Sequence, residues 1–494
     1  MEQCYDNQQG IKTTIGSDPI FMTQNLTPYP EYKESNIPWL GIVPSHWKVV
    51  PNRSIFYEII DRNHPNEEML SVTIRKGVIK QNILLSESSK KDSSNLDKSA
   101  YKMVQPGDIA YNKMRAWQGA IGVSDFKGIV SPAYIVVRPR QEINTKYFHY
   151  LMRTPAFNKE AERWSYGITS DQWSLRSEHF RMIYCSFPPL DEQAAIVRFL
   201  DHTGSRIKRY ILAKQKLIKL LNKQKQAVIH QAVTRGLDPN VPLKPSGVEW
   251  LGDVPEHWKI MKLKYEMSFC GGGTPSKANE DYWKGKIPWV SPKDMKSEII
   301  VDTEDHVTIK AVAESSTQLI PANTILMVVR SGILQRTIPI AQTSCEVSIN
   351  QDMKALIPKG NIIPEFFIYF VRGCEKELII EWTKQGATVE SIEFQYLSNS
   401  KIPIPPYQEQ KEIIQYLDEI VSGNTKVVLR ANQQISLLQE YHTRLIADVV
   451  TGKIDVRAAA SQLPVELEEL EQVEDLAEEI EELEDTEESI AEEA

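Results

Sequence analysis

Residues 188–201 read PPLDEQAAIVRFLD and residues 405–418 read PPYQEQKEIIQYLD, and this repeated stretch, which we call the helix motif, decides the fold. Alignment of Pro188 with Pro405 superimposes the two copies and their C-terminal flanks without a gap, including the pairs Gln193/Gln410, Asp201/Asp418 and Thr234/Thr451. Self-similarity at a fixed offset identifies one structural unit that occurs twice. The chain therefore holds two copies of one unit.

A second motif, the opening motif, begins each unit. IPWLGIVPSHWK at residues 37–48 recurs as VEWLGDVPEHWK at residues 248–259. Its repeated histidine would suit a ligand or a general base, but no acidic or cysteine partner is repeated at a fixed spacing beside it. We therefore expect the repeated tryptophan to be buried at the base of a domain, with the histidine as a polar group at its edge.

A long helical segment begins within each helix motif, and in the first unit it runs from about Glu192 to Arg235. Both segments show an apolar seam at alternating spacings of three and four residues, which is the heptad pattern of a coiled coil. The residues that we expect to pair the two helices are Leu200, Ile207, Ile211, Ile218, Leu221, Val228, Leu417, Val421, Val428, Ile435, Leu438 and Leu445. Some 44 residues span about 66 Å at 1.5 Å each, which favours a spacer over a helix packed on its own domain.

A variable body lies between the two motifs of each unit. Short runs such as MLSVTI (69–74) and TILMVV (324–329) predict strands in a mixed α+β domain. Long basic and amide side chains lie between these runs, and such side chains can read base edges in DNA, although a solvated surface position is the commoner alternative for any one of them. The candidate DNA contacts are Arg75, Lys76, Lys113, Arg115, Trp117 and Gln118 in the first body, and Lys277, Lys293, Arg330, Gln335, Arg336, Asn350 and Gln351 in the second.

The run GGGTPSK at residues 271–277 resembles a phosphate-binding loop, but Ser276 and Ala278 occupy positions where that loop requires Gly and Ser or Thr. We expect a flexible turn that can approach a DNA backbone closely. The five cysteines form no CxxC pair, so the sequence predicts neither a zinc cluster nor a disulfide framework. Without a charged-then-apolar leader or an uninterrupted apolar run of about 18 residues, we expect a cytoplasmic protein that does not contact a membrane.

Charge is distributed unevenly along the chain. Residues 466–494 contain sixteen Asp and Glu and no Lys or Arg, and removing these charges from the total of −9 leaves +7 for the rest. A basic body can attract a polyanion, although a modest excess is also common on a solvated surface. We expect the acidic tail to be disordered.

The doubled order of WLGxxPxHW, variable body, PPxxEQ, long helix and VTxG resembles the specificity subunit of bacterial type I restriction-modification systems, over residues 37 to about 455. The resemblance implies an α+β fold with two target recognition domains separated by two long antiparallel helices in pseudo-twofold symmetry. It implies that the chain reads a split, asymmetric target in double-stranded DNA. Its implied partners are two modification subunits, which methylate adenine with S-adenosylmethionine, and restriction subunits, which use ATP and Mg²⁺; no cofactor is implied in this chain.

These patterns divide the chain into six segments. We expect a mobile N-terminal extension (1–36), a first target recognition domain (37–187), a first spacer helix (188–238), a second target recognition domain (239–404), a second spacer helix (405–457) and the acidic tail (458–494).

Catalysis by this chain is not indicated. An amino-methyltransferase needs an Asn/Asp-Pro-Pro-aromatic loop, whereas Phe187-Pro188-Pro189-Leu190 lacks the polar first residue. Asp18 with Glu31 and Lys33 has the composition of a nuclease site, but these residues lie in the poorly patterned extension. The sequence therefore predicts a noncatalytic DNA-specificity subunit, with an autonomous DNA-modifying or DNA-cleaving enzyme and a protein-only scaffold as alternatives.

Overall fold

The computed structural model describes residues 26–86, 97–167, 173–383 and 390–464. The chain divides into two compact units, one formed by residues 1–216 with 432–494 and the other by residues 217–431. Each long helix therefore contributes one part to each unit.

The first unit is built on a four-stranded antiparallel sheet with the order β4-β11-β8-β9. Its strands are β4 (Phe56–Ile59), β11 (Tyr134–Pro139), β8 (Ile109–Asn112) and β9 (Ile121–Val123). Two-stranded antiparallel pairs surround it: β1 (Tyr32–Glu34) with β2 (Ile42–Pro44), β3 (Lys48–Pro51) with β12 (Tyr184–Phe187), β5 (Leu70–Thr73) with β6 (Gly77–Lys80), and β7 (Lys102–Val104) with β10 (Gly128–Val130). The short helices are α1 (Asn52–Ile55), α2 (Gln81–Ser86), η2 (Ala116–Gln118), α3 (Thr145–Met152), α4 (Pro155–Arg163), α5 (Ser177–Phe180) and α13 (Arg457–Ser461).

Two helix starts in this unit follow directly from local sequence. The Asn144 side chain accepts a hydrogen bond from the Lys146 N–H at the start of α3. The Thr154 side chain accepts one from the Phe157 N–H, and Pro155 occupies the first turn of α4. Both caps satisfy backbone donors that a helix start leaves without partners.

The second unit contains a five-stranded sheet, β16-β24-β21-β22-β18, and a four-stranded sheet, β19-β17-β23-β20. The strands are β16 (Met267–Gly271), β24 (Met353–Pro358), β21 (Ile325–Val328), β22 (Ile340–Thr343), β18 (Ile299–Ile300), β19 (His306–Val307), β17 (Ile287–Val290), β23 (Val347–Ile349) and β20 (Leu319–Ile320). Antiparallel pairs join β13 (Leu243–Pro245) to β14 (Asp253–Pro255) and β15 (Lys259–Lys262) to β25 (Lys401–Ile404). The helices are α7 (Leu263–Glu266), η4 (Glu280–Trp283), η5 (Pro292–Asp294), α8 (Ile309–Glu314), η6 (Gly332–Gln335), α9 (Pro364–Gly373), α10 (Glu375–Trp382) and α11 (Phe394–Asn399).

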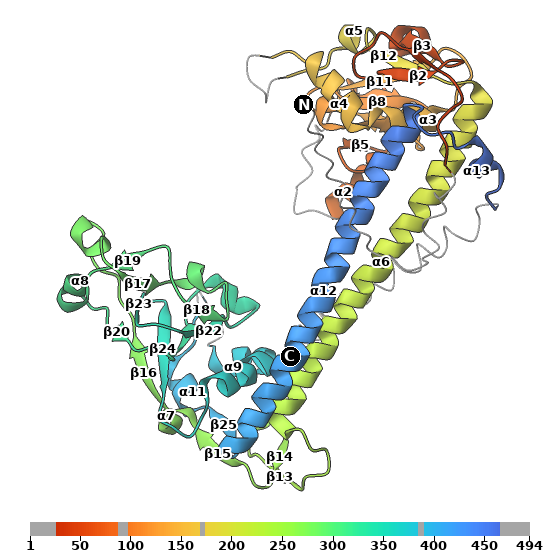
Figure 1. Cartoon of the computed structure of the whole chain (residues 1–494). Coiled ribbons are helices and arrows are strands. Elements are labelled where there is room, and N and C mark those ends of the chain that lie inside the picture. Colours follow the sequence, from red (N-terminus) through yellow and green to blue (C-terminus); the bar gives the residue numbers. More distant parts are fainter. Residues whose placement is uncertain (1–25, 87–96, 168–172, 384–389, 465–494) are drawn as a thin grey trace, which may run out of the picture. The chain divides into compact units, whose positions relative to one another are not determined.

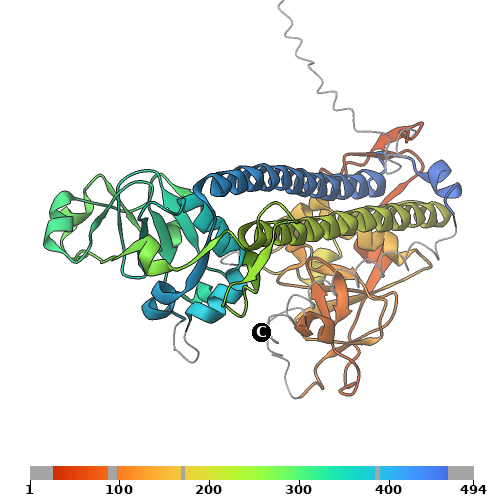
Figure 2. The same cartoon turned by 90° about the horizontal axis from the view of Figure 1, so that it is seen from below.

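Both predicted spacer helices are present as single helices, α6 (Leu190–Arg235) of 46 residues and α12 (Tyr407–Val450) of 44 residues. The beginning of α6 belongs to the same unit as the end of α12, and the reverse holds in the second unit, so the helices run antiparallel. They lie alongside each other in Figures 1 and 2. The residues that we predicted to pair them are all buried or half-buried. In the second unit the Asn424 side-chain amide donates to the Leu221 carbonyl at 2.8 Å.

The ends of both helices belong to the cores of the bodies. In the first unit, Ile196 and Leu200 of α6 and Val449 of α12 are buried in one cluster with Trp47 and Phe148. The second unit repeats this arrangement with Ile229, Val233, Ile413, Trp258 and Phe367. Trp47 and Trp258 of the opening motifs are therefore buried where a body meets the helices, as the sequence predicts.

The opening and helix motifs contact each other, which corrects our interpretation of the repeated histidine. The His46 ring lies 2.8 Å from the Glu192 carboxylate, and the His257 ring lies 2.7 Å from Glu409. Both glutamates belong to the helix motif. The acidic partner is therefore repeated, but it comes from a distant part of the chain.

The C-terminal ends of the long helices lie against the opening motifs. Gly236 and Gly452 follow α6 and α12 with φ of 77° and 78°, a conformation that glycine adopts without strain. A Cβ on Gly452 would meet Trp47, and one on Gly236 would meet Trp258. The two glycines are therefore equivalent, although Gly236 lies two residues after Thr234 and Gly452 lies one residue after Thr451.

Two predicted boundaries need correction. Residues 26–36, which we assigned to the extension, include β1 and place Tyr29 in the core at 3% exposure. Residues 458–464, which we assigned to the tail, include most of α13, and Ala460 is buried. The rest of the extension and of the tail lies outside the described residues.

Candidate nucleic-acid interface

Seven of the thirteen candidate contacts lie on two equivalent loops. Residues 113–120 join the antiparallel strands β8 and β9 of the first unit, and residues 329–339 join the antiparallel strands β21 and β22 of the second. Each loop contains one 3₁₀ turn, η2 or η6. We call these segments the first and second reading loops.

In the first reading loop, Arg115 and Gln118 are exposed, and Lys113 and Trp117 are half-buried. The Trp117 indole donates to the Met114 carbonyl at 3.1 Å. Its ring meets that of Trp173 edge-on, with centroids 5.5 Å apart. Trp117 therefore shapes the loop, while the guanidinium of Arg115 and the amide of Gln118 are accessible to a ligand.

Arg75 and Lys76 lie in the turn between β5 and β6, and both are exposed. One side chain joins this turn to the first reading loop. The Arg153 guanidinium donates to the carbonyls of Ile74 at 2.8 Å and Arg75 at 2.6 Å, and to those of Gly119 at 3.0 Å and Ile121 at 2.8 Å. The structure thus brings the two groups of first-body candidates together.

The second reading loop exposes Arg330, Gln335 and Arg336. Its last residues are held by Glu375 of α10, whose carboxylate accepts from the Thr337 hydroxyl at 2.5 Å and the Ile338 N–H at 2.7 Å. The C-terminal end of this loop is therefore fixed by hydrogen bonds to Glu375, while its cationic and amide side chains are exposed.

The remaining second-body candidates lie outside the second reading loop. Lys293 forms ion pairs with Glu304 at 3.1 Å and Asp305 at 2.9 Å, and hydrogen bonds to these carboxylates raise the pKa of its ammonium group. Asn350 is buried and bonds to Asp352. Lys293 and Asn350 are thus engaged within the protein. Lys277 and Gln351 are exposed, and the Gln351 side-chain oxygen accepts from the Thr274 hydroxyl.

The glycine run at residues 271–273 has a packing role. A Cβ on Gly272 would collide with the Asn350 carbonyl, and one on Gly273 with the Ser316 side chain. The space that Gly272 and Gly273 leave is filled by the protein's own chain, and the approach of this turn to a DNA backbone stays a prediction.

The two bodies share a segment that we did not predict. Residues 150–153 (YLMR) end α3 and lead into the next helix, and residues 369–372 (YFVR) lie in α9. The Tyr150 hydroxyl donates to Asp201 at 2.5 Å, and the Tyr369 hydroxyl donates to Asp418 at 2.6 Å. The signal was present as a repeated Tyr-x-x-Arg, but the offset between its two copies differs from the offset that aligns the helices.

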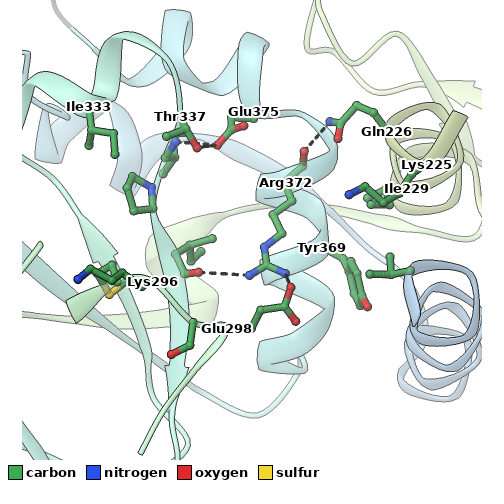
Figure 3. Close-up of a pocket in the computed structure, with 16 residues that line it drawn as sticks. Lys225, Gln226, Ile229, Lys296, Glu298, Ile333, Thr337, Tyr369, Arg372 and Glu375 are labelled. Carbon is green, nitrogen blue, oxygen red and sulfur yellow. Dashed lines mark hydrogen bonds and ion pairs between the residues drawn. The ribbon is translucent and has the colours of Figure 1, made fainter. Parts of the chain in front are cut away.

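A cavity of about 470 Å³ lies beside this segment in the second unit (Figure 3). It is lined by Tyr369 and Arg372 of α9, by Gln226 and Ile229 of α6, and by residues 295–298. The Arg372 guanidinium bonds to the Glu298 carboxylate at 2.6 Å and makes a longer contact of 3.5 Å with the Ile340 carbonyl.

The first unit has a smaller cavity of about 280 Å³ at the equivalent place. Tyr150 and Arg153 line it together with Thr443 and Ile446 of α12, which the ungapped alignment of the helices pairs with Gln226 and Ile229. Nearby, burial, with Arg153 and Lys146 close by, lowers the pKa of His149 to about 3, and its ring nitrogen accepts from the Val123 N–H at 3.3 Å. A neutral imidazole is therefore part of the first body.

In the part of the chain that the structure describes, no group of three His, Cys, Asp or Glu side chains is placed to hold a metal ion. Among the described helices, none combines the length and the apolar character that crossing a bilayer requires.

Comparison with known proteins identifies one family. The model of the type I restriction modification DNA specificity domain matches residues 44–220 and 255–437. The Type I restriction enzyme EcoR124I/EcoR124II specificity subunit of Escherichia coli is 34% identical over 311 residues, covering 61% of this chain and 70% of its own. The Putative type I restriction enzyme MjaX specificity subunit of Methanocaldococcus jannaschii is 23% identical, covering 86% and 98%.

A solved chain shares the fold. It comes from a study of complex assembly and conformational transition of the type I R-M system, with a TM-score of 0.63 and 17% identity, and the match covers 83% of this chain and 98% of that one.

Proposed function

The chain belongs to the type I restriction-modification DNA specificity family, and from this premise we propose that its two bodies read the two different halves of a split DNA target. Recognition of a DNA sequence is the role of the family. The observation that carries the finer proposal is the pair of equivalent reading loops, which occupy the same place in the two units but differ in length and side chains.

The side chains on these loops have chemistry suited to base edges. Arginine pairs with guanine and glutamine with adenine in the major groove, and each such pair contributes about 1–3 kcal/mol of discrimination. Arg115 and Gln118 occupy the first reading loop, and Arg330, Gln335 and Arg336 occupy the second. Because the two sets differ, we expect the two half-sites to differ, which makes the target asymmetric.

The partners that we propose are two modification subunits and the restriction subunits of such a system. The modification subunits would methylate adenines with S-adenosylmethionine, and the restriction subunits would use ATP and Mg²⁺. This chain would scaffold them through the helices α6 and α12 and contribute no catalytic group. In support, both helices are repeated with their motif contacts, so two identical partners would find two equivalent surfaces.

Mapping of methylated adenines in cells that express the chain with a modification subunit tests this function. We expect one bipartite motif, with methylation in each half. Methylation that is independent of this chain would contradict the role in recognition. Cleavage of DNA by the pure chain with Mg²⁺ would favour an autonomous enzyme, and assembly without any DNA affinity would favour a protein-only scaffold.

We also propose that the paired helices set the spacing between the half-sites. The heptads alone would place matched insertions after Leu221 and Leu438, but the contact between Asn424 and Leu221 places the matching point in α12 at Asn424. Insertion of one heptad after Leu221 and one after Asn424 preserves the seam and adds about 10.5 Å, or about three base pairs.

We expect methylation mapping of this double-insertion variant to return the same half-sites with a spacer longer by about three base pairs, or no activity if the added rotation about the duplex is not accommodated. An active variant with an unchanged spacer would end the ruler hypothesis. An insertion after Leu221 alone is the control, because it leaves one helix without a partner for its added turns.

A further inference from the structure

The Tyr-x-x-Arg segments, residues 150–153 and 369–372, connect the long helices to the reading loops. Their tyrosines face the helices. Tyr150 donates to Asp201 on α6, and Tyr369 donates to Asp418 on α12, and both aspartates close the helix motif. Burial and the nearby Asp418 raise the pKa of the Tyr369 hydroxyl, which keeps it a donor.

A second repeated contact fixes the start of α3 and the start of α9 to the long helices. The side-chain oxygen of Gln193 accepts from the Asn144 N–H at 2.9 Å, and that of Gln410 accepts from the Ile363 N–H at 2.8 Å. These residues directly precede α3 and α9. Both α3 and α9 are therefore fixed to a long helix at two points, independently of their arginines.

The arginines face the other way, toward the loops. Arg153 bonds to carbonyls of the β5–β6 turn and of the first reading loop, so one guanidinium holds both segments that carry the first-body candidates. A guanidinium has five N–H donors in one plane, and a lysine ammonium cannot reproduce that geometry. The carbonyls of the β5–β6 turn would lose these donors if Arg153 were replaced.

Arg372 repeats this role with fewer contacts. Its bond to Ile340 corresponds to the bond of Arg153 to Ile121, since the alignment of Arg153 with Arg372 also aligns the two isoleucines. Its other partner is a side chain, the 68% exposed carboxylate of Glu298. An exposed ion pair holds a loop less firmly than several carbonyl bonds to a half-buried arginine.

We propose that Arg153 and Arg372 are positioning residues for DNA reading, each fixing the loops of its own body relative to its long helix and so setting discrimination at one half-site. The inference rests on the proposed function. Arg153 has the larger effect because it joins two candidate segments. Arg372 contacts Ile340, where β22 begins after the second reading loop, and the end of that loop is held by Glu375.

The test uses the chain assembled with its modification subunits and measures binding to the mapped target and to two duplexes, each with one half-site altered. For Arg153→Lys we expect discrimination at one half-site to fall about tenfold, within the range that one base contact contributes. Discrimination at the other half-site stays within about twofold. Arg372→Lys lowers discrimination at the opposite half-site by about threefold, since one exposed ion pair contributes less.

Arg140→Lys is the matched control. Arg140 lies in the first body and also bonds to backbone carbonyls, those of Arg53 and Phe56 at 3.0 and 3.2 Å, but it touches neither reading segment. It should leave discrimination at both half-sites unchanged. Tyr150→Phe removes the hydroxyl bond to Asp201, and we expect it to lower discrimination at the same half-site as Arg153→Lys.

Equal losses at both half-sites, or unchanged discrimination in Arg153→Lys, would overturn the inference, as would the same effect from Arg140→Lys. If Arg153→Lys does not fold, Tyr150→Phe decides the question by the same half-site comparison. A wild-type complex that discriminates at neither half-site would overturn the proposed function itself, which is a different result from a variant that fails to change one half-site.

Discussion

The two units hold their long helices through the same contacts but hold their reading loops through different ones. His46 and His257 both meet the glutamate of a helix motif, and Tyr150 and Tyr369 both meet its aspartate. By contrast, the first reading loop is held by carbonyl bonds to Arg153, and the second is held by the carboxylate of Glu375 at its end and by backbone hydrogen bonds to Asp352 and Glu390 at its start. The contacts between the opening and helix motifs therefore follow one geometry in both units, whereas the reading loops are fixed in different ways.

Replacement of the buried tryptophans gives the largest effect that the comparison predicts. Trp47 and Trp258 are both 0% exposed. We expect Trp47→Ala and Trp258→Ala each to lower the free energy of unfolding by about 3–5 kcal/mol. Denaturant unfolding measures the loss, and proteolysis with peptide mapping shows where the chain opens.

Each tryptophan variant should become sensitive to proteolysis only within its own unit. Trp283→Ala is the control, because this ring is half-buried and lies outside the opening and helix motifs. If Trp47→Ala opened both units to the same extent, the two copies would not be independent in stability, and the comparison would break.

The glutamates of the two helix motifs should differ in their contribution to stability, because their surroundings differ. Glu192 has a 3% exposed side chain and accepts from Tyr29 at 2.5 Å in addition to His46, whereas Glu409 is 24% exposed and accepts from the Trp258 indole at 3.0 Å. A hydrogen bond to a charged group contributes more when it is buried.

We therefore expect Glu192→Gln to cost about 2 kcal/mol and Glu409→Gln about 1 kcal/mol. Amide hydrogen exchange in each unit would measure the two losses separately. Equal losses, or a larger loss for Glu409→Gln, would show that the N-terminal segment carrying Tyr29 does not strengthen the first copy.

The smallest predicted difference is in pH dependence. His149 has a pKa of about 3 in the folded first unit, against 6.5 for an ordinary histidine, and its equivalent in the second unit is Ile368. Between pH 3 and 6.5 the unfolded chain therefore binds more protons than the folded chain. The contribution of the neutral His149 to stability is complete above pH 6.5 and is lost as the pH falls toward 3. Acidification from pH 7 to 5.5 should lower the stability of the first unit by about 1 kcal/mol through this group.

Thermal unfolding of wild type and His149→Asn at several pH values would measure this contribution as the difference between their slopes. The variant should lose part of the acid sensitivity of the first unit and leave the second unchanged. Identical slopes would mean that the buried imidazole is not neutral in the folded state.

Features that repeat at a constant offset could be predicted from sequence. Gln193 and Gln410 lie in an ungapped alignment, and the apolar seams predicted both long helices because a heptad pattern is local. The contact between His46 and Glu192 could not be found in this way, because its partners are 146 residues apart in the first unit and 152 in the second. A body of variable length lies between them and removes the constant spacing.

The reading loops were predicted in part. The sequence shows cationic and amide residues between the predicted strands, but it does not show which of these side chains bond to other residues of the protein. In the sequence, Lys293 and Lys277 are both lysines between predicted strands. Only the fold shows that Glu304 and Asp305 lie beside Lys293. Arg153 was missed because its partners are backbone carbonyls, which every residue has and no motif reveals.

The most direct test of the account is an exchange of one body. Residues 49–187 are replaced by the corresponding body of another specificity subunit that retains the Tyr-x-x-Arg segment, so that the paired strands β3 and β12 are exchanged nearly whole. Methylated adenines are then mapped in cells that contain the modification subunit. The account predicts that one half-site changes while the other half-site and the spacer remain the same. A change in both half-sites would contradict it.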